Sequence, residues 1–155
     1  MTIPEKKSAP RAKKTPQVEE SPMYQVSFER LAQLKRSAVQ LIAARRPPSC
    51  PSRGKPDHEL SDPQELVTEI ADYCAGEEGF IRSELPVQEI IFRVLLTRSN
   101  EPTALRDLHY EVTERWSTPI RPINLTEKGL ERILDADTYY GFSKLVSDPQ
   151  QPETA

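Results

Sequence analysis

Residues 85–98 read LPVQEIIFRVLLTR, and apolar side chains cover most of the circumference of the helix that this stretch predicts. Pro86 falls in the first turn, where its missing N–H costs no helical hydrogen bond. The apolar positions are Val87, Ile90, Ile91, Phe92, Val94, Leu95 and Leu96. A helix that is apolar over so wide an arc must be covered by other elements, so we expect it at the centre of the core.

Further helices are expected on both sides of this central one, because apolar residues recur there at helical spacing. The first begins after Asp62, an N-cap residue that is followed by Pro63 at the first helical position. A later helix covers 103–116, and the last covers 126–137. The segment 138–146, TYYGFSKLV, is aromatic and β-prone and predicts one short C-terminal β segment.

A separate amphipathic helix is predicted over 27–46, with Ser27 as its N-cap. Its apolar stripe consists of Phe28, Leu31, Leu34, Ala38, Leu41 and Ile42. Pro47 and Pro48 end it, because proline lacks the backbone donor that a helix needs. An isolated helix of this length is marginal in water, so its apolar face requires a partner. The sequence leaves three partners open: the rest of the chain, a second copy and another protein.

Composition divides the chain into five parts. Residues 1–26 are expected to form a disordered basic tail, because they hold too little apolar surface to offset the entropy of ordering. The helix over 27–46 follows, and then a Pro-rich linker over 47–60. An acidic helical domain is expected over 61–146, and a second disordered tail over 147–155.

Charge is distributed unevenly along the chain. Residues 1–56 contain twelve Lys and Arg against four Asp and Glu, whereas residues 57–155 contain nine against twenty. Such asymmetry indicates that the two halves have different partners, or that the basic tail folds back on its own acidic domain. At physiological salt the second contact would be loose, because charges are screened within about 8 Å.

The expected fold class is mainly α: a small helical domain with one short C-terminal β segment, preceded by a disordered tail and one amphipathic helix. The order of core helix, second helix, third helix and β segment resembles that of a winged-helix domain. Two features depart from this pattern. The loop over 117–123 is longer than the turn of a standard helix-turn-helix, and little more than one strand fits after the last helix. A plain orthogonal helical bundle is the alternative.

No set of residues has the spacing of an active site or a metal site. The cysteines, Cys50 and Cys74, and the histidines, His58 and His109, do not match a zinc pattern. We therefore expect a protein that is not an enzyme, with no catalytic residue, metal or cofactor. No stretch approaches the roughly 20 apolar residues of a membrane span. The charged first residues lack the apolar region of a secretory signal, so a cytoplasmic location is expected.

These features predict a non-enzymatic adaptor, a protein-interaction module in which the acidic domain binds a protein partner and the basic tail is a salt-sensitive tether. The expected partner-binding residues, chosen as aromatic or apolar anchors, are Tyr139, Tyr140, Phe142, Trp116, Phe28, Leu31 and Leu34. The expected tether consists of Lys6, Lys7, Arg11, Lys13, Lys14, Arg45 and Arg46, and nucleic acid is an alternative partner for this basic arm. The alternative is a nucleic-acid-binding regulator with a winged-helix-like domain. Acidic residues outnumber basic ones in the helix over 126–137, and this disfavours binding beside phosphates.

Overall fold

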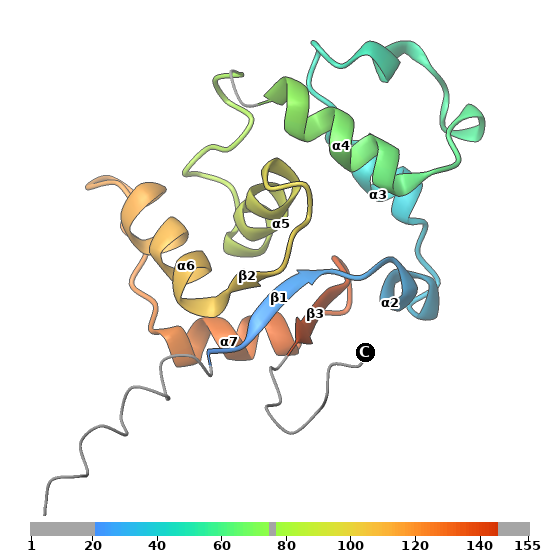
Figure 1. Cartoon of the computed structure of the whole chain (residues 1–155). Helices are drawn as coiled ribbons and strands as arrows, with labels where there is room; N and C mark the ends of the chain where they lie inside the picture. Colours follow the sequence, from blue (N-terminus) through green and yellow to red (C-terminus); the bar gives the residue numbers. More distant parts are fainter. Residues whose placement is uncertain (1–20, 75–76, 146–155) are drawn as a thin grey trace, which may run out of the picture.

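The computed structural model describes residues 21–74 and 77–145 (Figure 1). These residues form a small, mostly helical domain with a three-stranded antiparallel sheet. The elements are β1 (Met23–Val26), α2 (Phe28–Gln33), α3 (Ala38–Ala43), two short 3₁₀ turns (Pro51–Gly54 and Asp57–Glu59), α4 (Pro63–Cys74), α5 (Val87–Thr97), β2 (Thr103–Ala104), α6 (Leu105–Tyr110), a π-helical turn (Glu111–Arg115), α7 (Glu127–Asp135) and β3 (Phe142–Leu145). No helix in the described ranges is long and apolar enough to cross a membrane.

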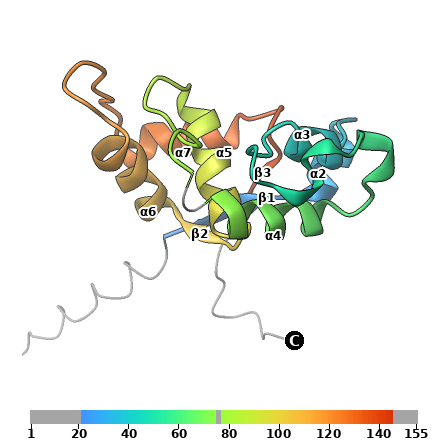
Figure 2. The same ribbon diagram turned by 90° about the horizontal axis from the view of Figure 1, so that it is seen from above.

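The predicted central helix is confirmed as α5. It lies between α6 and α4 in both views of the ribbon (Figure 1, Figure 2). Its apolar side chains from Ile90 to Phe92 and from Val94 to Leu96 are buried in one hydrophobic core with residues of every other helix. The predicted start of α4 is also confirmed, because the Asp62 carboxylate accepts a hydrogen bond from the Gln64 N–H at 2.9 Å.

The sheet has the order β2–β1–β3, so the strand nearest the N-terminus is the middle one. Tyr24 pairs with Thr103 on one side and with Lys144 on the other. Tyr24 and Val26 are buried, which matches the alternation expected of a strand with one face on the core. The prediction that 1–26 is a disordered tail is therefore wrong for 23–26, whereas residues 1–20 lie outside the described residues.

The single helix predicted over 27–46 is two helices joined at a corner. Ser27 caps α2 as predicted, but Ser37 caps a second helix by accepting a hydrogen bond from the Gln40 N–H at 3.1 Å. Lys35 lies at the corner with a left-handed φ of 63°. The Ser37 hydroxyl thus caps a new helix, α3, and this competes with continuation of α2. Both helices pack into the common core, so the partner of this apolar face is the chain's own domain.

The Asn100 side chain extends the sheet beside β1. Its amide accepts a hydrogen bond from the Val26 N–H and donates one to the Val26 carbonyl, both at 2.8 Å. We expect Asn100→Ala to lower the free energy of unfolding by about 2 kcal/mol or more, because two buried backbone groups lose their partner and because alanine disfavours the left-handed φ of 59° at this position. Urea unfolding measures this loss. The exposed Asn124→Ala variant is the control and should leave the midpoint unchanged; equal losses in both variants would contradict the prediction.

Candidate functional site

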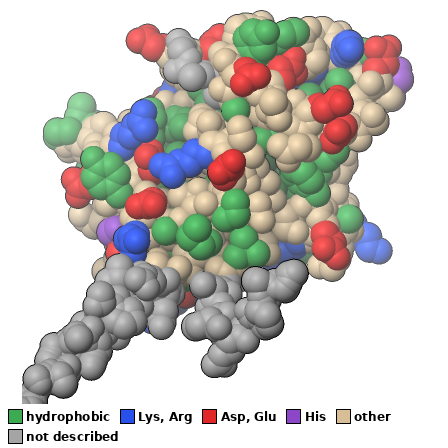
Figure 3. Space-filling model, in the orientation of Figure 1, with side chains coloured by type: hydrophobic (Ala, Val, Ile, Leu, Met, Phe, Trp, Pro, Cys, Tyr) green, Lys and Arg blue, Asp and Glu red, His purple; other side chains and the backbone are tan. Residues whose placement is uncertain are grey.

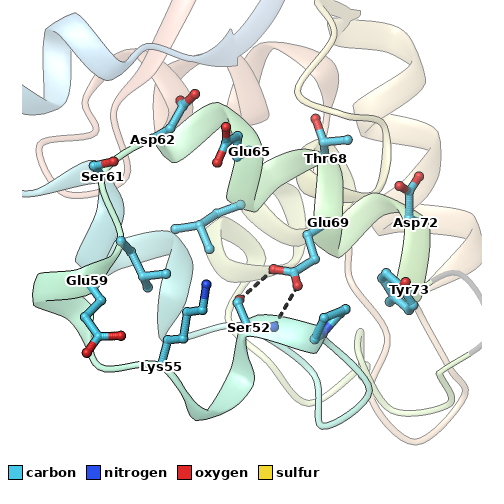
Figure 4. Close-up of a pocket in the computed structure, with 13 residues that line it drawn as sticks. Ser52, Lys55, Glu59, Ser61, Asp62, Glu65, Thr68, Glu69, Asp72 and Tyr73 are labelled. Atoms are coloured by element: carbon cyan, nitrogen blue, oxygen red, sulfur yellow. Dashed lines mark hydrogen bonds between the residues drawn. The ribbon is translucent and has the colours of Figure 1, made fainter.

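A groove of about 460 Å³ lies between α4 and the segment 51–62 (Figure 4). Glu65, Thr68, Glu69, Asp72 and Tyr73 line it from successive turns of α4. The opposite wall comes from the segment 51–62, in which the half-buried Leu60 adds apolar surface. We call this surface the acidic groove.

The wall of the acidic groove is fixed by hydrogen bonds. The Glu69 carboxylate accepts from the Ser52 N–H at 2.8 Å and from the Ser52 hydroxyl at 2.6 Å (Figure 4). Behind the wall, the buried Arg46 guanidinium donates to the backbone carbonyls of Ala43, Ser52 and Lys55. The segment 47–60, predicted as a linker, is thus packed against the domain.

The charge of the groove is strongly negative. Of the residues that line it, one is basic, Lys55, and five are acidic: Glu59, Asp62, Glu65, Glu69 and Asp72. Figure 3 shows acidic side chains gathered over the upper part of the molecule, where α4 and the 51–62 segment lie in Figure 1. No group of three or more potential metal ligands occurs in the described part of the chain, so these carboxylates are spread along a surface. Such a surface suits an extended cationic segment.

Most of the predicted partner-binding residues belong to the core. Leu31 and Phe142 are 0% and 4% exposed, so neither can contact a partner. Phe28, Leu34, Trp116 and Tyr140 are half-buried. Tyr140 packs on the Phe142 ring at 5.4 Å between centroids, and Tyr139, 40% exposed, touches Tyr140 edge-on. The structure thus brings the 139–142 aromatics together, while Trp116 ends the π turn and lines a different cavity with Phe80.

The structure describes only two residues of the predicted tether, Arg45 and Arg46. Lys6, Lys7, Arg11, Lys13 and Lys14 lie outside the described residues. Arg45 donates two hydrogen bonds to Glu89, at 2.9 and 2.8 Å, and Arg46 is buried against backbone carbonyls. Both guanidinium groups are used inside the domain, so the inclusion of Arg45 and Arg46 in a tether is corrected.

Sequence reasoning missed Glu89 as the charged centre of the core. Its carboxylate also accepts hydrogen bonds from Arg93 at 2.7 Å and from the Tyr140 hydroxyl at 2.8 Å. Burial opposes its ionisation, but the bonds from Arg45, Arg93 and Tyr140 outweigh burial and lower the Glu89 pKa to about 2. A signal was present, because a lone carboxylate on an otherwise apolar face requires buried partners, and Arg93 follows it at i+4.

The hydrogen bonds of Glu89 connect α5 with the end of α3, through Arg45, and with the 138–142 turn, through Tyr140. His109 is also structural, since its Nε2 lies 2.5 Å from the Leu125 carbonyl and holds the 117–126 loop. Comparisons of the chain with protein-family models, with curated proteins and with solved structures gave no match. Function is therefore inferred from the grooves and charges of the domain itself.

Proposed function

We propose that this protein is a non-enzymatic adaptor whose acidic groove binds an extended basic segment of a protein partner. The observation that carries the proposal is the groove itself, whose lining contains five carboxylates and one lysine and whose wall is fixed by the hydrogen bonds between Ser52 and Glu69. The carboxylates of Glu65 and Asp72 are exposed and make no hydrogen bond or ion pair within the described residues, so their charge is available to a partner.

A peptide segment fits this surface better than a small ligand does. The groove runs along α4 and combines the apolar surface of Leu60 and Tyr73 with an acidic rim. Lysine and arginine side chains have the matching form, because their apolar stems pack on such surface while the charged head reaches a carboxylate. Affinity gained in this way is sensitive to salt and acts largely on the rate of association.

The basic residues of the first part of the chain are proposed to supply a second contact. Lys6, Lys7, Arg11, Lys13 and Lys14 form a cationic cluster within residues 1–20, which lie outside the described residues. The same cluster is complementary to the acidic groove, so it competes with a partner if it reaches that surface. Binding is therefore to be compared in the full chain and in a variant with glutamine at these five positions.

A nucleic-acid-binding regulator with a winged-helix-like domain is the second candidate. The order α5, α6, α7 and β3, with β1 and β2 completing a small sheet, supports that description of the fold. The charges of α7 do not favour DNA, because its acidic residues outnumber its basic ones and the nearby cation Lys144 is already bound to Glu131 and Asp135 at 2.7 and 2.9 Å. Binding of duplex DNA that is lost in a Lys128→Gln, Arg132→Gln variant would favour this candidate over the adaptor.

The adaptor proposal predicts the effect of two charge substitutions in the groove. A labelled peptide of alternating basic and small apolar residues is titrated by fluorescence anisotropy at low and physiological salt. We expect the double variant Glu65→Gln, Asp72→Asn to bind about fivefold or more weakly, since each lost exposed charge pair is worth up to about 1 kcal/mol.

The control removes the same number of charges elsewhere. Glu101 and Glu114 are exposed and lie outside the groove, so Glu101→Gln, Glu114→Gln changes the net charge equally. The adaptor proposal requires this control to bind like the unaltered protein. Equal weakening in the two double variants would mean that the peptide responds to net charge alone, and it would overturn the assignment to the groove.

A further inference from the structure

A second concave surface, about 330 Å³ in volume, lies at the corner between α2 and α3. We call it the basic pocket. Its charged lining residues are all cations, Lys35, Arg36 and Arg45, and Tyr139 closes one side. This is notable on a domain whose residues 21–145 contain sixteen Lys and Arg against nineteen Asp and Glu. A local cluster of cations on an acidic domain indicates an anionic ligand.

Arg36 is held in place without an ionic partner. Its guanidinium carbon lies 3.8 Å from the centroid of the Tyr139 ring, a cation–π contact that fixes the side chain and leaves the charge unpaired. Its Nε is buried and has no hydrogen-bond acceptor among the described residues. Lys35 likewise makes no ion pair in the described ranges. Arg36 is held by the Tyr139 ring and Lys35 is exposed beside it, so the two cations can meet an incoming oxyanion.

Arg45 forms the inner part of the basic pocket. Its hydrogen bonds to Glu89 hold the guanidinium in place, and the same carboxylate also accepts a hydrogen bond from Arg93. Two guanidinium groups thus share one carboxylate, so a net positive charge remains beside the pocket. Among the residues that the structure describes, no carboxylate lines the pocket.

A third cavity lies beside both the basic pocket and the acidic groove. That cavity shares Ser37 and Gln40 with the basic pocket, and Leu60 and Ser61 with the acidic groove. It lies between α3 and the 57–61 segment, and α3 itself packs on α4. One extended chain can therefore lie with its cationic part in the groove and an anionic side chain in the pocket.

We propose that the basic pocket binds a phosphorylated side chain of the same partner segment whose basic residues occupy the acidic groove. The proposal rests on the adaptor function for its peptide, and the phosphoryl site is the new part. A phosphoryl group carries nearly two negative charges and three acceptor oxygens, which match the donors of Lys35 and Arg36. An anionic membrane is a poorer occupant, because the adjoining acidic groove would be repelled by its surface.

The test uses the full chain and a matched set of labelled peptides. Each peptide has the basic segment followed, after linkers of increasing length, by serine, glutamate or phosphoserine. We expect phosphoserine to tighten binding about tenfold over serine at the best linker length, and glutamate to do less. Lys35→Asn, Arg36→Gln should abolish the gain from phosphate while binding the serine peptide as before. Asparagine is chosen at position 35 because it tolerates the left-handed backbone there.

Two controls separate a lost site from lost folding. Arg82→Gln removes an exposed cation outside the pocket and should retain the full gain. Arg36→Lys keeps the charge but not the planar fork, so it should retain part of the gain. Thermal melting of every variant checks that it is folded.

The outcomes distinguish this inference from the adaptor function. If the serine peptide binds and phosphate adds nothing at any linker length, the phosphoryl site is overturned and the adaptor stands. If no peptide binds, both fail. If Lys35→Asn, Arg36→Gln instead abolishes binding to vesicles that contain phosphatidylserine, without changing peptide binding, the pocket belongs to a lipid headgroup and the proposal is wrong.

Discussion

Replacing Glu89 with alanine is expected to lower the free energy of unfolding by about 3–5 kcal/mol, because removal of one partner leaves buried charges uncompensated. Four hydrogen bonds end on this carboxylate, two from Arg45, one from Arg93 and one from Tyr140. The side chains of Arg45 and Glu89 are only 12% and 9% exposed, so water is a poor replacement for the lost acceptor. Chemical denaturation measures the loss directly.

The control for this prediction is an ion pair of the same type on the surface. Glu84 binds Arg82 at 3.0 Å, but more than half of each side chain is exposed. Glu84→Ala should therefore cost less than about 1 kcal/mol. If Glu89→Ala costs no more than Glu84→Ala, the buried network does not stabilise the core in the way described.

Acid unfolding gives a second measurement on the same group. The Glu89 pKa is lowered from 4.5 to about 2 in the native state. A lowered carboxyl pKa stabilises the native protein fully above pH 4.5, and this stabilisation disappears as the pH falls toward 2. We expect about 2 kcal/mol to be lost over this interval, after allowance for solvent screening. Glu89→Gln cannot titrate, so its stability should fall less steeply between the same pH values.

The helices that could be predicted are those whose signals are local. The wide apolar arc of 87–96 requires burial whatever surrounds it, and α5 is the core helix. Asp62 was the expected cap of α4, and its carboxylate accepts a hydrogen bond from the Gln64 N–H in the first turn of that helix. Caps and apolar stripes act within one or two turns, so a single sequence shows them directly.

The elements that could not be predicted depend on distant residues. β1 has four residues, and its partners, Thr103 and Lys144 among them, lie far along the chain. A strand so short has too little alternation to stand out from its Pro-rich and charged surroundings. The boundary at 61 therefore leaves the middle strand of the sheet, α2 and α3 outside the predicted domain. For the same reason, the acidic groove was not foreseen, since its wall depends on the contact between Ser52 and Glu69.

Gly141→Ala is expected to lower the free energy of unfolding by about 3 kcal/mol, from two separate causes. Gly141 has a φ of 80°, in the left-handed region that a side chain disfavours. A Cβ at this position would also lie 2.6 Å from Cγ of the fully buried Leu31 and 3.2 Å from the Ser27 carbonyl oxygen. The turn cannot move away easily, because the Asp137 carboxylate accepts hydrogen bonds from the N–H groups of 139–142.

Gly79→Ala separates the two causes. Gly79 has a similar φ of 90°, but no atom of the described residues lies within 4 Å of the added Cβ, so this variant should show only the backbone cost of about 1–2 kcal/mol. The rest of the Gly141→Ala loss should come from the contact with Leu31. Urea unfolding of Gly141→Ala, Leu31→Ala and the double variant tests this. Leu31→Ala removes the atoms that the new Cβ would meet, so the double variant should lose less free energy of unfolding than the sum of the two single losses. Strict additivity of the two losses, or equal losses at Gly79 and Gly141, would show that the close approach of Leu31 does not restrict position 141.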